Sequence, residues 1–460
     1  MDFQTLLKKN PWWKGKEYFE QDPDYSKLTE AELQWDPELE NKIELAPFSL
    51  NFLFGPRQAG KTTALKLLIK KTIENKDPKS VFYFNCDEIG DYKELKDVLE
   101  EYLIYREREG IDSSLIILDE ITAPNEWWRT IKSLIDDATL SKDVLILTGS
   151  ASIEVKKQTE YFPGRRGKGK DYTMYPLSFK KYVDVVDPDL SKKLTGKPSK
   201  DIVFLEEINK LLKDYFISGG FPLAINSYHR KRRIPRALAP LAPFSLRRTV
   251  ESNQKNGKVE DDIKSTYLAW VKNDLTKTGK DERIAREIIK VLLGKMPSPL
   301  SFEGIASETS IKSPKTIASY LHTLSDLFVL ELAYFIDPNT EVIQFGKNKK
   351  IELIDPLLFQ IFEDWGLVEI KEKESVIAES VLAVHLYRKY KNIFYWSGKE
   401  EIDCVIQKEN KLMGYECKWK EKAKEKKIKV GRLKEVYTIS KKDFGGKIIP
   451  LSLFLYALEK

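Results

Sequence analysis

The chain has 460 residues, and its 77 Lys or Arg against 71 Asp or Glu leave a formal net charge of only +6. A chain of this length exceeds one hydrophobic core, so we expect about three domains. The small net charge excludes a uniformly basic nucleic-acid-binding protein, and any site for nucleic acid must come from local clustering.

Cysteine and histidine usage excludes two further classes. The three cysteines and three histidines are scattered singly, without zinc-ligand spacing and without enough cysteines for a disulfide framework. The sequence shows no signal peptide and no apolar run of about eighteen residues. We therefore expect a cytoplasmic protein with no membrane partner.

The first half of the chain predicts an arm followed by an α/β domain. Residues 1–47 are polar and aromatic, so we expect them to pack onto the next domain rather than to form a core alone. Residues 48–150 alternate short apolar runs with helical patterns, which predicts a parallel sheet covered on both faces. The expected strands are 50–54, 81–86, 115–118 and 144–147, and the expected helices are 61–75, 93–109 and 126–140.

A phosphate-binding loop follows the first expected strand. Residues 55–62 fit the pattern G-x-x-x-x-G-K-[ST] between a hydrophobic strand and an amphipathic helix. Its backbone N–H groups and the helix N-terminus would bind the phosphates of ATP or ADP, with Lys61 on the β- and γ-phosphates and Thr62 on Mg²⁺. The predicted nucleotide-binding residues are Gly55, Pro56, Arg57, Gln58, Ala59, Gly60, Lys61, Thr62, Thr63 and Ser150.

A second strand ends in two acids. Residues 114–120 read Ser-Leu-Ile-Ile-Leu-Asp-Glu, and Asp119 is positioned to hold Mg²⁺ while Glu120 polarises the attacking water. The alternative is that both acids only cap the next helix. Thr148 or Ser150, after the following strand, is the candidate sensor of the γ-phosphate.

Phosphoryl transfer also needs a cation near the developing charge. Arg57 lies in the phosphate-binding loop itself. Arg165 and Arg166 follow the expected strand 144–147, here named the sensor strand because the candidate sensor residues come directly after it. Each could act within the chain or from a neighbouring copy. A solvated basic loop is an equal alternative for each.

Several segments, in order, carry a family resemblance. They are GPRQAGKTT, LIILDE with WWRTIKSLIDD, TGSAS, PGRRGKGKDYTMYPLSF and SGGFP, with NPWW near the start. Together they resemble an archaeal-type P-loop ATPase family of the AAA-like branch over nearly the whole chain. The resemblance implies an ATPase domain, a helical region, a winged helix and a C-terminal nuclease-like domain, without naming a substrate.

Residues 281–345 have the pattern of a winged helix. Ser313 is a good N-cap with Pro314 at the first helical position, and 328–330 resembles the strand of the wing. Ile317, Leu321 and Leu324 would face inward, and Lys315, Thr316, Ser319 and His322 would face out as in a DNA recognition helix. A packing or protein-contact role is the open alternative, because Lys312 and Lys315 supply little charge.

Residues 346–460 return to strands, with a helix at 375–390. Asp403 followed by Glu416-x-Lys418 fits the loose PD-(D/E)xK nuclease pattern, although Ile402 stands where that pattern often has proline. Asp403 and Glu416 could hold Mg²⁺, with Lys418 positioning water and Glu379 as the extra acid on the helix. The alternative is a domain of this fold that does not use catalysis.

The predicted fold class is α/β. The predicted domains are an arm (1–47), an AAA-like P-loop NTPase core with a parallel sheet (48–185), a helical region (186–280), a winged helix (281–345) and a restriction-endonuclease-like domain (346–460). In the first functional hypothesis, an ATPase gates a Mg²⁺-dependent nuclease that acts on DNA. In the second, it is a nucleotide switch whose C-terminal domains bind DNA or a protein without cutting, with a homo-oligomer as another possible partner. A phosphotransferase is disfavoured because lid and acceptor-site patterns are missing.

Overall fold

The computed structural model describes residues 2–149, 162–233, 259–409 and 411–459. Its contacts divide the chain into two compact units, Met1–Tyr175 and Pro176–Lys460, here named the N-terminal unit and the C-terminal unit. Within these described ranges, no helix has both the length and the apolar character needed to cross a membrane.

The N-terminal unit alternates strands and helices as the sequence predicts. Its helices are α1 (Phe3–Lys9), α2 (Pro23–Glu30), α3 (Lys61–Asn75), α4 (Tyr92–Arg108) and α5 (Trp128–Asp136), and its strands are β1 (Ser49–Phe54), β2 (Val81–Asn85), β3 (Leu115–Asp119), β4 (Val144–Thr148) and β5 (Asp171–Thr173). Short 3₁₀ helices are η1 (Pro11–Lys14), η2 (Lys16–Gln21), η3 (Leu39–Asn41), η4 (Pro78–Ser80) and η5 (Cys86–Glu88). The helix expected over 126–140 is shorter, because Glu126 and Ala138 adopt the left-handed conformation at its two ends.

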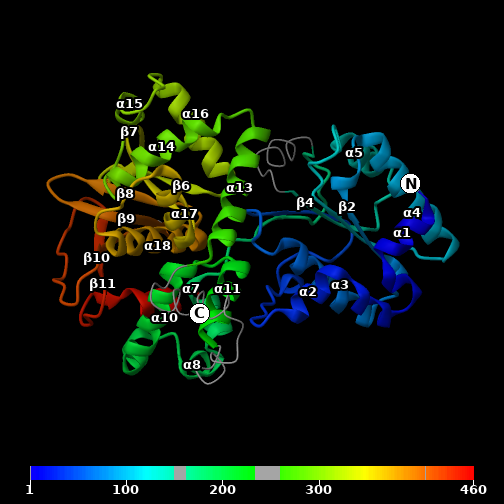
Figure 1. The fold of residues 1–460 in the computed structure, drawn as a ribbon, viewed down its shortest axis with the longest axis horizontal. Helices are drawn as coiled ribbons and strands as arrows, with labels where there is room; N and C mark the ends of the chain where they lie inside the picture. The colour runs from blue at the N-terminus through cyan, green and yellow to red at the C-terminus, as the bar shows by residue number, and fades with distance from the viewer. Residues whose placement is uncertain (1, 150–161, 234–258, 410, 460) are drawn as a thin grey trace, which may run out of the picture. The chain divides into compact units, whose positions relative to one another are not determined.

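The sheet of this unit is a parallel one with the order β2-β3-β4-β1-β5. Every residue of β1, β3 and β4 is buried, as expected for strands covered on both faces. In Figure 1, α3 lies on one face of this sheet and α5 on the other. The N-terminal unit therefore has a P-loop NTPase fold, and the carboxyl ends of β1, β3 and β4 meet at one edge.

The predicted arm packs onto this sheet. The indole Nε1 atoms of Trp12 and Trp13 each donate a hydrogen bond of 2.9 Å to the carbonyl of Val81, the first residue of β2. Lys66 on α3 forms a buried ion pair of 2.7 Å with Asp22, which precedes α2. The arm thus belongs to the core of the N-terminal unit.

The C-terminal unit is a helical region followed by a mixed sheet. Its first helices are α7 (Phe179–Val186), α8 (Pro188–Lys193), α9 (Pro198–Asp201), η6 (Ile202–Phe204), α10 (Leu205–Ser218), α11 (Pro222–Arg233), α13 (Asp261–Lys277), α14 (Glu282–Lys295), α15 (Phe302–Ser307) and α16 (Pro314–Asp326). The remaining elements are β6 (Leu330–Ile336), β7 (Ile343–Leu353), α17 (Pro356–Gly366), α18 (Lys373–Tyr390), β8 (Phe394–Ser397), β9 (Glu401–Lys408), β10 (Lys411–Lys418), β11 (Leu433–Ser440), β12 (Ile448–Pro450) and α19 (Leu451–Leu458).

The seven strands of this unit have the order β12-β11-β10-β9-β8-β6-β7. The structure differs here from two expectations. Of the wing strand expected at 328–330, only Leu330 lies in β6, which pairs with β7 and β8. The expected boundary at 345/346 falls inside β7. The sequence interpretation also missed α17, a helix of which most residues are buried.

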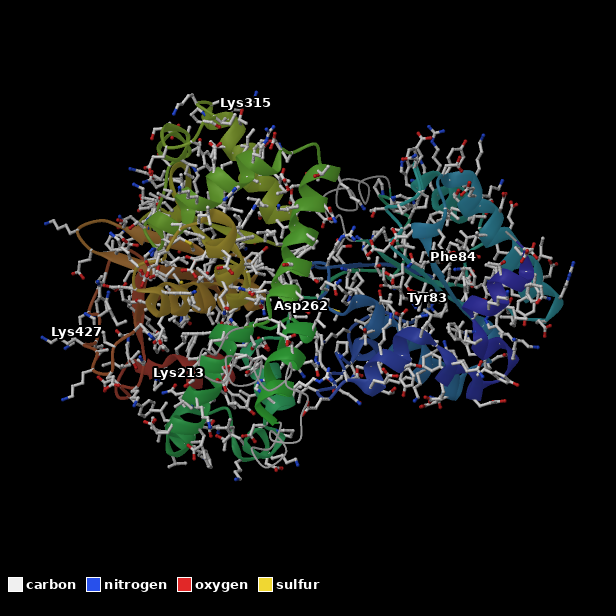
Figure 2. The ribbon with its side chains drawn as sticks, in the orientation of Figure 1. Tyr83, Phe84, Lys213, Asp262, Lys315 and Lys427 are labelled. Atoms are coloured by element: carbon white, nitrogen blue, oxygen red, sulfur yellow. The ribbon has the colours of Figure 1, made fainter. Side chains whose placement is uncertain are left out.

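Helix α7, at the end of the expected ATPase core, packs against α10 and α19 and lies in the C-terminal unit by its contacts. Further along, Ser313 caps α16 by accepting from the N–H of Thr316, and Pro314 is its first residue, as predicted. Lys315 is exposed and points away from the ribbon in Figure 2.

Candidate nucleotide site and C-terminal carboxylate cluster

The predicted phosphate loop connects the end of β1 to the start of α3. Gly55 has φ 147°, and a side-chain carbon there would lie 2.1 Å from the carbonyl oxygen of Met174, so only glycine fits. Gly60, at φ 92°, precedes the first turn of α3 and starts the helix without a side-chain cap. The loop residues between them include exposed Gln58, which is also left-handed, and partly buried Arg57.

Lys61 is buried at the first position of α3. Its ammonium Nζ donates to the carbonyl oxygens of Gly55 at 2.9 Å and of Pro56 at 3.0 Å. These contacts hold the positive charge inside the loop, where the N-terminal dipole of α3 also favours an anion.

Three polar residues connect the loop to the acidic strand. The hydroxyl of Thr62 donates to Oδ2 of Asp119 at 2.7 Å, and the hydroxyl of Tyr83 donates to the same oxygen at 3.1 Å. The hydroxyl of Thr148 hydrogen-bonds to the other oxygen, Oδ1. Asp119 is 1% exposed, so this network is shielded from bulk water. Sequence reasoning missed Tyr83, which lies in an ordinary apolar strand; Figure 2 labels it.

Glu120 follows Asp119 in a left-handed conformation with φ 52°. Its N–H donates to Oδ1 of Asp119 at 3.2 Å and to the hydroxyl of Thr148 at 3.3 Å. A non-glycine residue held in this region costs energy and is often found at functional sites.

The donor set at this edge fits a magnesium ion. Thr62 supplies a hydroxyl and Asp119 a carboxylate, and oxygen ligands of this kind are those that Mg²⁺ prefers. The two groups are close enough to share one ion or its bound water. Ser150, which is also predicted for this site, lies outside the described residues.

The two arginines after the sensor strand lie away from the phosphate loop. Arg165 pairs with Asp136 at 2.5 Å, which lowers the pKa of that carboxyl through the hydrogen bond, and Arg166 pairs with Asp171 at 2.5 Å. The carbonyl of Arg166 accepts from the N–H of Leu50, near the start of β1, whereas the loop follows the end of β1. Neither arginine reaches its own chain's phosphate loop in this arrangement.

The predicted acidic residues of the C-terminal unit come together in a carboxylate cluster. Glu379 on α18, Asp403 on β9 and Glu416 on β10 are each at least nine-tenths buried. Lys418 pairs with Glu416 at 2.6 Å, and Oδ2 of Asp403 accepts from the N–H of Cys417 at 2.8 Å. Burial and the nearby Asp403 raise the pKa of Glu416 above its usual value.

A lysine that the sequence interpretation missed lies inside this cluster. The ammonium of Lys350, on β7, is 2.6 Å from Oε1 of Glu379, 2.7 Å from Oε1 of Glu401 and 2.9 Å from Oδ1 of Asp403. Burial lowers its pKa, but Asp403, Glu379 and Glu401 more than offset this and raise the pKa well above the ordinary value. The run Lys347-Asn-Lys-Lys resembles an exposed basic turn, so no sequence signal pointed to this role.

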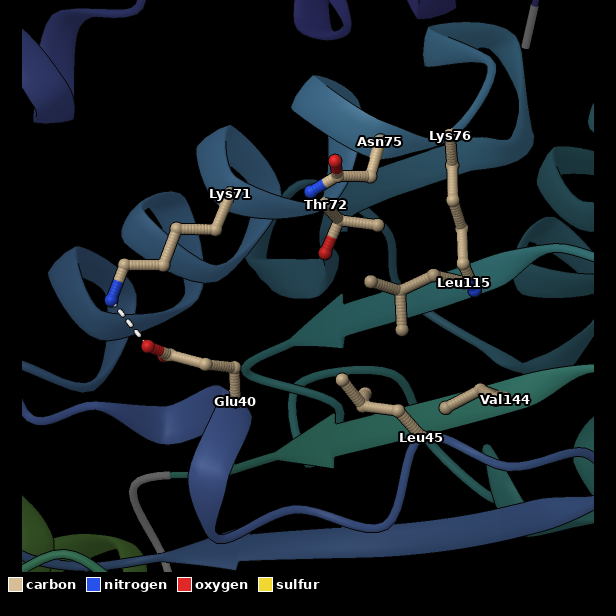
Figure 3. Close-up of a pocket in the computed structure, with 8 residues that line it drawn as sticks. All are labelled: Glu40, Leu45, Lys71, Thr72, Asn75, Lys76, Leu115 and Val144. Carbon is tan, nitrogen blue, oxygen red and sulfur yellow. Dashed lines mark hydrogen bonds and ion pairs between the residues drawn. The ribbon is translucent and has the colours of Figure 1, made fainter.

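A cavity of about 270 Å³ in the N-terminal unit lies at the amino ends of the strands, opposite the ends that carry the predicted nucleotide site. It is lined by Leu115 and Val144, the first residues of β3 and β4, and by Thr72 and Lys71 of α3. Figure 3 shows Lys71 paired with Glu40 at its rim. Because the phosphate loop follows the opposite ends of these strands, this cavity is not the nucleotide site.

Two family models match separate parts of the chain. A model described as an AAA domain matches residues 48–183, and one described as a domain of unknown function (DUF4143) matches residues 373–449. An uncharacterized protein of Methanocaldococcus jannaschii is 31% identical over 147 residues, which are 31% of this chain and 29% of that protein. The chain thus spans less than a third of that relative's length.

Two solved structures with some likeness to the chain have low sequence identity to it. The Walker-type ATPase of Pyrococcus abyssi is 12% identical with a TM-score of 0.39, covering 76% of this chain and 97% of that one. The ORC2 protein of Aeropyrum pernix, in its ADPNP-ADP complexes, is 11% identical with a TM-score of 0.40, covering 69% and 88%. The AAA-domain match and the parallel sheet together make the region from residue 48 an AAA-type ATPase domain with a P-loop.

Proposed function

We propose that this protein hydrolyses ATP at the carboxyl edge of the N-terminal sheet. The observation that carries the proposal is the hydrogen-bonded connection from Thr62 through Asp119 to Thr148. It links the phosphate loop, the acidic strand and the sensor strand at one point. Lys61 would bind the β- and γ-phosphates, and Glu120 would orient and polarise the attacking water. Mg²⁺ held by Thr62 and Asp119 would neutralise charge on the phosphate oxygens.

The stabilising cation for the transferred phosphate is a separate part of the proposal. Arg57 is the candidate within the chain, because it lies in the loop itself. Arg165 and Arg166 are engaged with Asp136 and Asp171. They would act only by leaving these carboxylates, for example on the nucleotide of a neighbouring copy.

The test is ATP binding by calorimetry together with phosphate release in Mg²⁺. Lys61→Ala is expected to lose both, and Glu120→Gln to keep ATP binding while hydrolysis falls roughly 100-fold. Lys93→Ala, which removes an exposed lysine from α4, serves as the control and should match the wild type. A wild-type protein without measurable affinity for ATP would rule the proposal out.

A second proposed function is non-cleaving binding of nucleic acid by the C-terminal unit. It rests on the lysine-rich segment, defined as residues 418–434, which contains nine Lys or Arg and two Glu. Lys422, Lys424, Lys427 and Lys429 are exposed, and none of these four forms an ion pair with another described residue. Lys427 points outward in Figure 2. Such a cluster matches the phosphate backbone of a nucleic acid, whose binding is dominated by charge.

The experiment is fluorescence anisotropy with a duplex DNA over a range of salt concentrations. Replacing Lys422, Lys424, Lys427 and Lys429 with Gln should weaken binding at least about tenfold and lower the salt slope by about 0.9 for each lost phosphate contact. The matched control replaces the exposed Lys192, Lys193, Lys197 and Lys200, which removes the same charge elsewhere on the unit. Equal weakening by both sets would mean that only net charge matters and would exclude a localised site.

A further inference from the structure

The carboxylate cluster of the C-terminal unit already contains a cation. Lys350 is about 1% exposed in its side chain, and its ammonium lies 2.6 to 2.9 Å from oxygens of Glu379, Glu401 and Asp403. An ammonium has three N–H donors, and three carboxylate oxygens are within hydrogen-bond distance to accept them. The positive charge therefore sits between acids that come from a helix and a strand far from Lys350 in sequence.

A divalent metal does not fit beside this ammonium. In the PD-(D/E)xK pattern the metal would be held by Asp403 and Glu416. However, Oδ1 of Asp403 faces Lys350 and its Oδ2 accepts from the N–H of Cys417. Oε1 of Glu416 faces Lys418 at 2.6 Å and Lys426 at 3.4 Å. Across the described parts of the chain, no group of three or more His, Cys, Asp or Glu side chains is arranged to hold a metal ion.

One acceptor of the cluster is left over. Oε2 of Glu416 is buried and has no hydrogen-bond partner among the described residues. A single carboxylate oxygen does not make a Mg²⁺ site, which needs near-octahedral oxygen ligands at about 2.0–2.1 Å. Because this oxygen is available to a metal ion, Glu416 is the residue to replace if the protein with Lys350 intact is found to bind metal.

We propose that Lys350 is a built-in cation that replaces the divalent metal in this cluster. The C-terminal unit then keeps the folded form of a nuclease-like site without metal-dependent cleavage. Removing the ammonium should open a divalent-cation site made by Glu379, Glu401 and Asp403. The buried carboxylates of Glu379 and Asp403, together with the partly exposed Glu401, would then lack a counter-charge and favour a cation that can enter. The proposal is independent of ATP hydrolysis, since none of these residues belongs to the N-terminal unit.

The test is Mn²⁺ binding by electron paramagnetic resonance, without nucleotide and in the Asp119→Asn background, so that the phosphate-loop site does not contribute. With Lys350 intact we expect no saturable Mn²⁺ site. Lys350→Met, which keeps much of the apolar stem, should gain one saturable Mn²⁺ site, with an affinity for Mn²⁺ at least about tenfold above that of the protein with Lys350 intact. Added Mn²⁺ should then also raise the melting temperature of this variant. Adding Asp403→Asn to Lys350→Met should abolish the gained site.

Lys349→Met is the matched control. Lys349 is the adjacent buried lysine, and its ammonium lies over the ring of Phe302 at 4.2 Å rather than among the acids. The control should gain no Mn²⁺ site. A folded Lys350→Met protein that binds no Mn²⁺ would overturn the proposal.

Measurements on the protein with Lys350 intact decide the matter even if Lys350→Met does not fold. A Mn²⁺ site that is lost in Glu416→Gln, or DNA cleavage that needs Mg²⁺ or Mn²⁺ and is lost in Asp403→Asn, would overturn the proposal. Absence of both supports it.

Discussion

The hydroxyl of Thr62 donates a hydrogen bond of 2.7 Å to Oδ2 of Asp119, although the two residues are 57 positions apart. Thr62 lies in the first turn of α3, which follows β1, and Asp119 is the last residue of β3. In the sheet, β4 lies between β1 and β3. The contact exists because the carboxyl ends of parallel strands meet at one edge of the sheet. It joins the two residues that the sequence predicts to hold Mg²⁺.

The first prediction concerns this pair. Thr62→Ala and Asp119→Asn should each lower Mg²⁺-dependent ATP hydrolysis roughly 100-fold or more, and the double variant should be little worse than either, because groups that act as a unit are not additive. Steady-state phosphate release measures this. Thr62→Ser keeps the hydroxyl and should retain most of the activity; strict additivity of the two losses would argue against a shared role.

The second prediction concerns the buried ion pair that joins the arm to α3. Lys66 and Asp22 are each 3% exposed in their side chains, so Lys66→Met would leave a buried carboxylate without its partner. We expect a loss of about 3–5 kcal/mol in the unfolding of the N-terminal unit, measured by denaturant titration. Adding Asp22→Asn, which keeps an N-cap acceptor for α2, should recover part of this loss.

The control for that pair is Lys27→Met. Lys27 lies 3.4 Å from Asp24 with 77% of its side chain exposed. Its loss should change stability by less than about 1 kcal/mol. If Lys27→Met and Lys66→Met had equal effects, burial would not be the cause.

The third prediction concerns the segment after the sensor strand. A side-chain carbon at Gly169 would lie 2.0 Å from the carbonyl oxygen of Leu50 on β1, and the backbone cannot easily move there because Phe52 donates to the carbonyl of Lys170. Gly169→Ala should therefore lower the melting temperature of the N-terminal unit by several degrees. In Gly90→Ala the new carbon would meet only a side-chain oxygen of Glu94 at 4.0 Å, and calorimetry should find this control close to the wild type.

The fourth prediction concerns pH. His385 is buried on α18, with Nε2 accepting from the N–H of Phe179 at 3.0 Å and Nδ1 2.7 Å from the carbonyl of Val381, so the proton is on Nδ1. Burial, with a smaller contribution from Arg388, lowers the pKa of His385 to about 3. Because the folded pKa lies below the unfolded value of about 6.5, the stability from the neutral ring is present above pH 6.5 and is lost as pH falls toward 3.

The corresponding measurement is the unfolding free energy of the C-terminal unit at pH 7 and at pH 4. The wild type should lose on the order of 3 kcal/mol more over this range than His385→Gln, which has no ring to protonate. Parallel pH profiles for the two proteins would show that His385 does not carry this dependence.

Most of the local elements between residues 48 and 148 followed from the sequence alone. The helix expected over 61–75 begins and ends where α3 does, and the four expected strands lie within one or two residues of β1 to β4. The reason is that the loop glycines, the apolar runs and the helical periods are properties of neighbouring residues. The same holds for Ser313 and Pro314 at the start of α16.

Tertiary structure decided which distant groups meet. The phosphate loop predicted that a triphosphate binds, but only the sheet order brings Tyr83 and Thr148 to Asp119 and places Arg165 and Arg166 near the other end of β1. The pattern of acids in the C-terminal unit suggested a metal, whereas the fold inserts Lys350 from β7 between Glu379 and Asp403. A spacing rule cannot foresee that contact, because it depends on the packing of strands and a helix, and a single buried ammonium reverses the chemistry that the acids alone would predict.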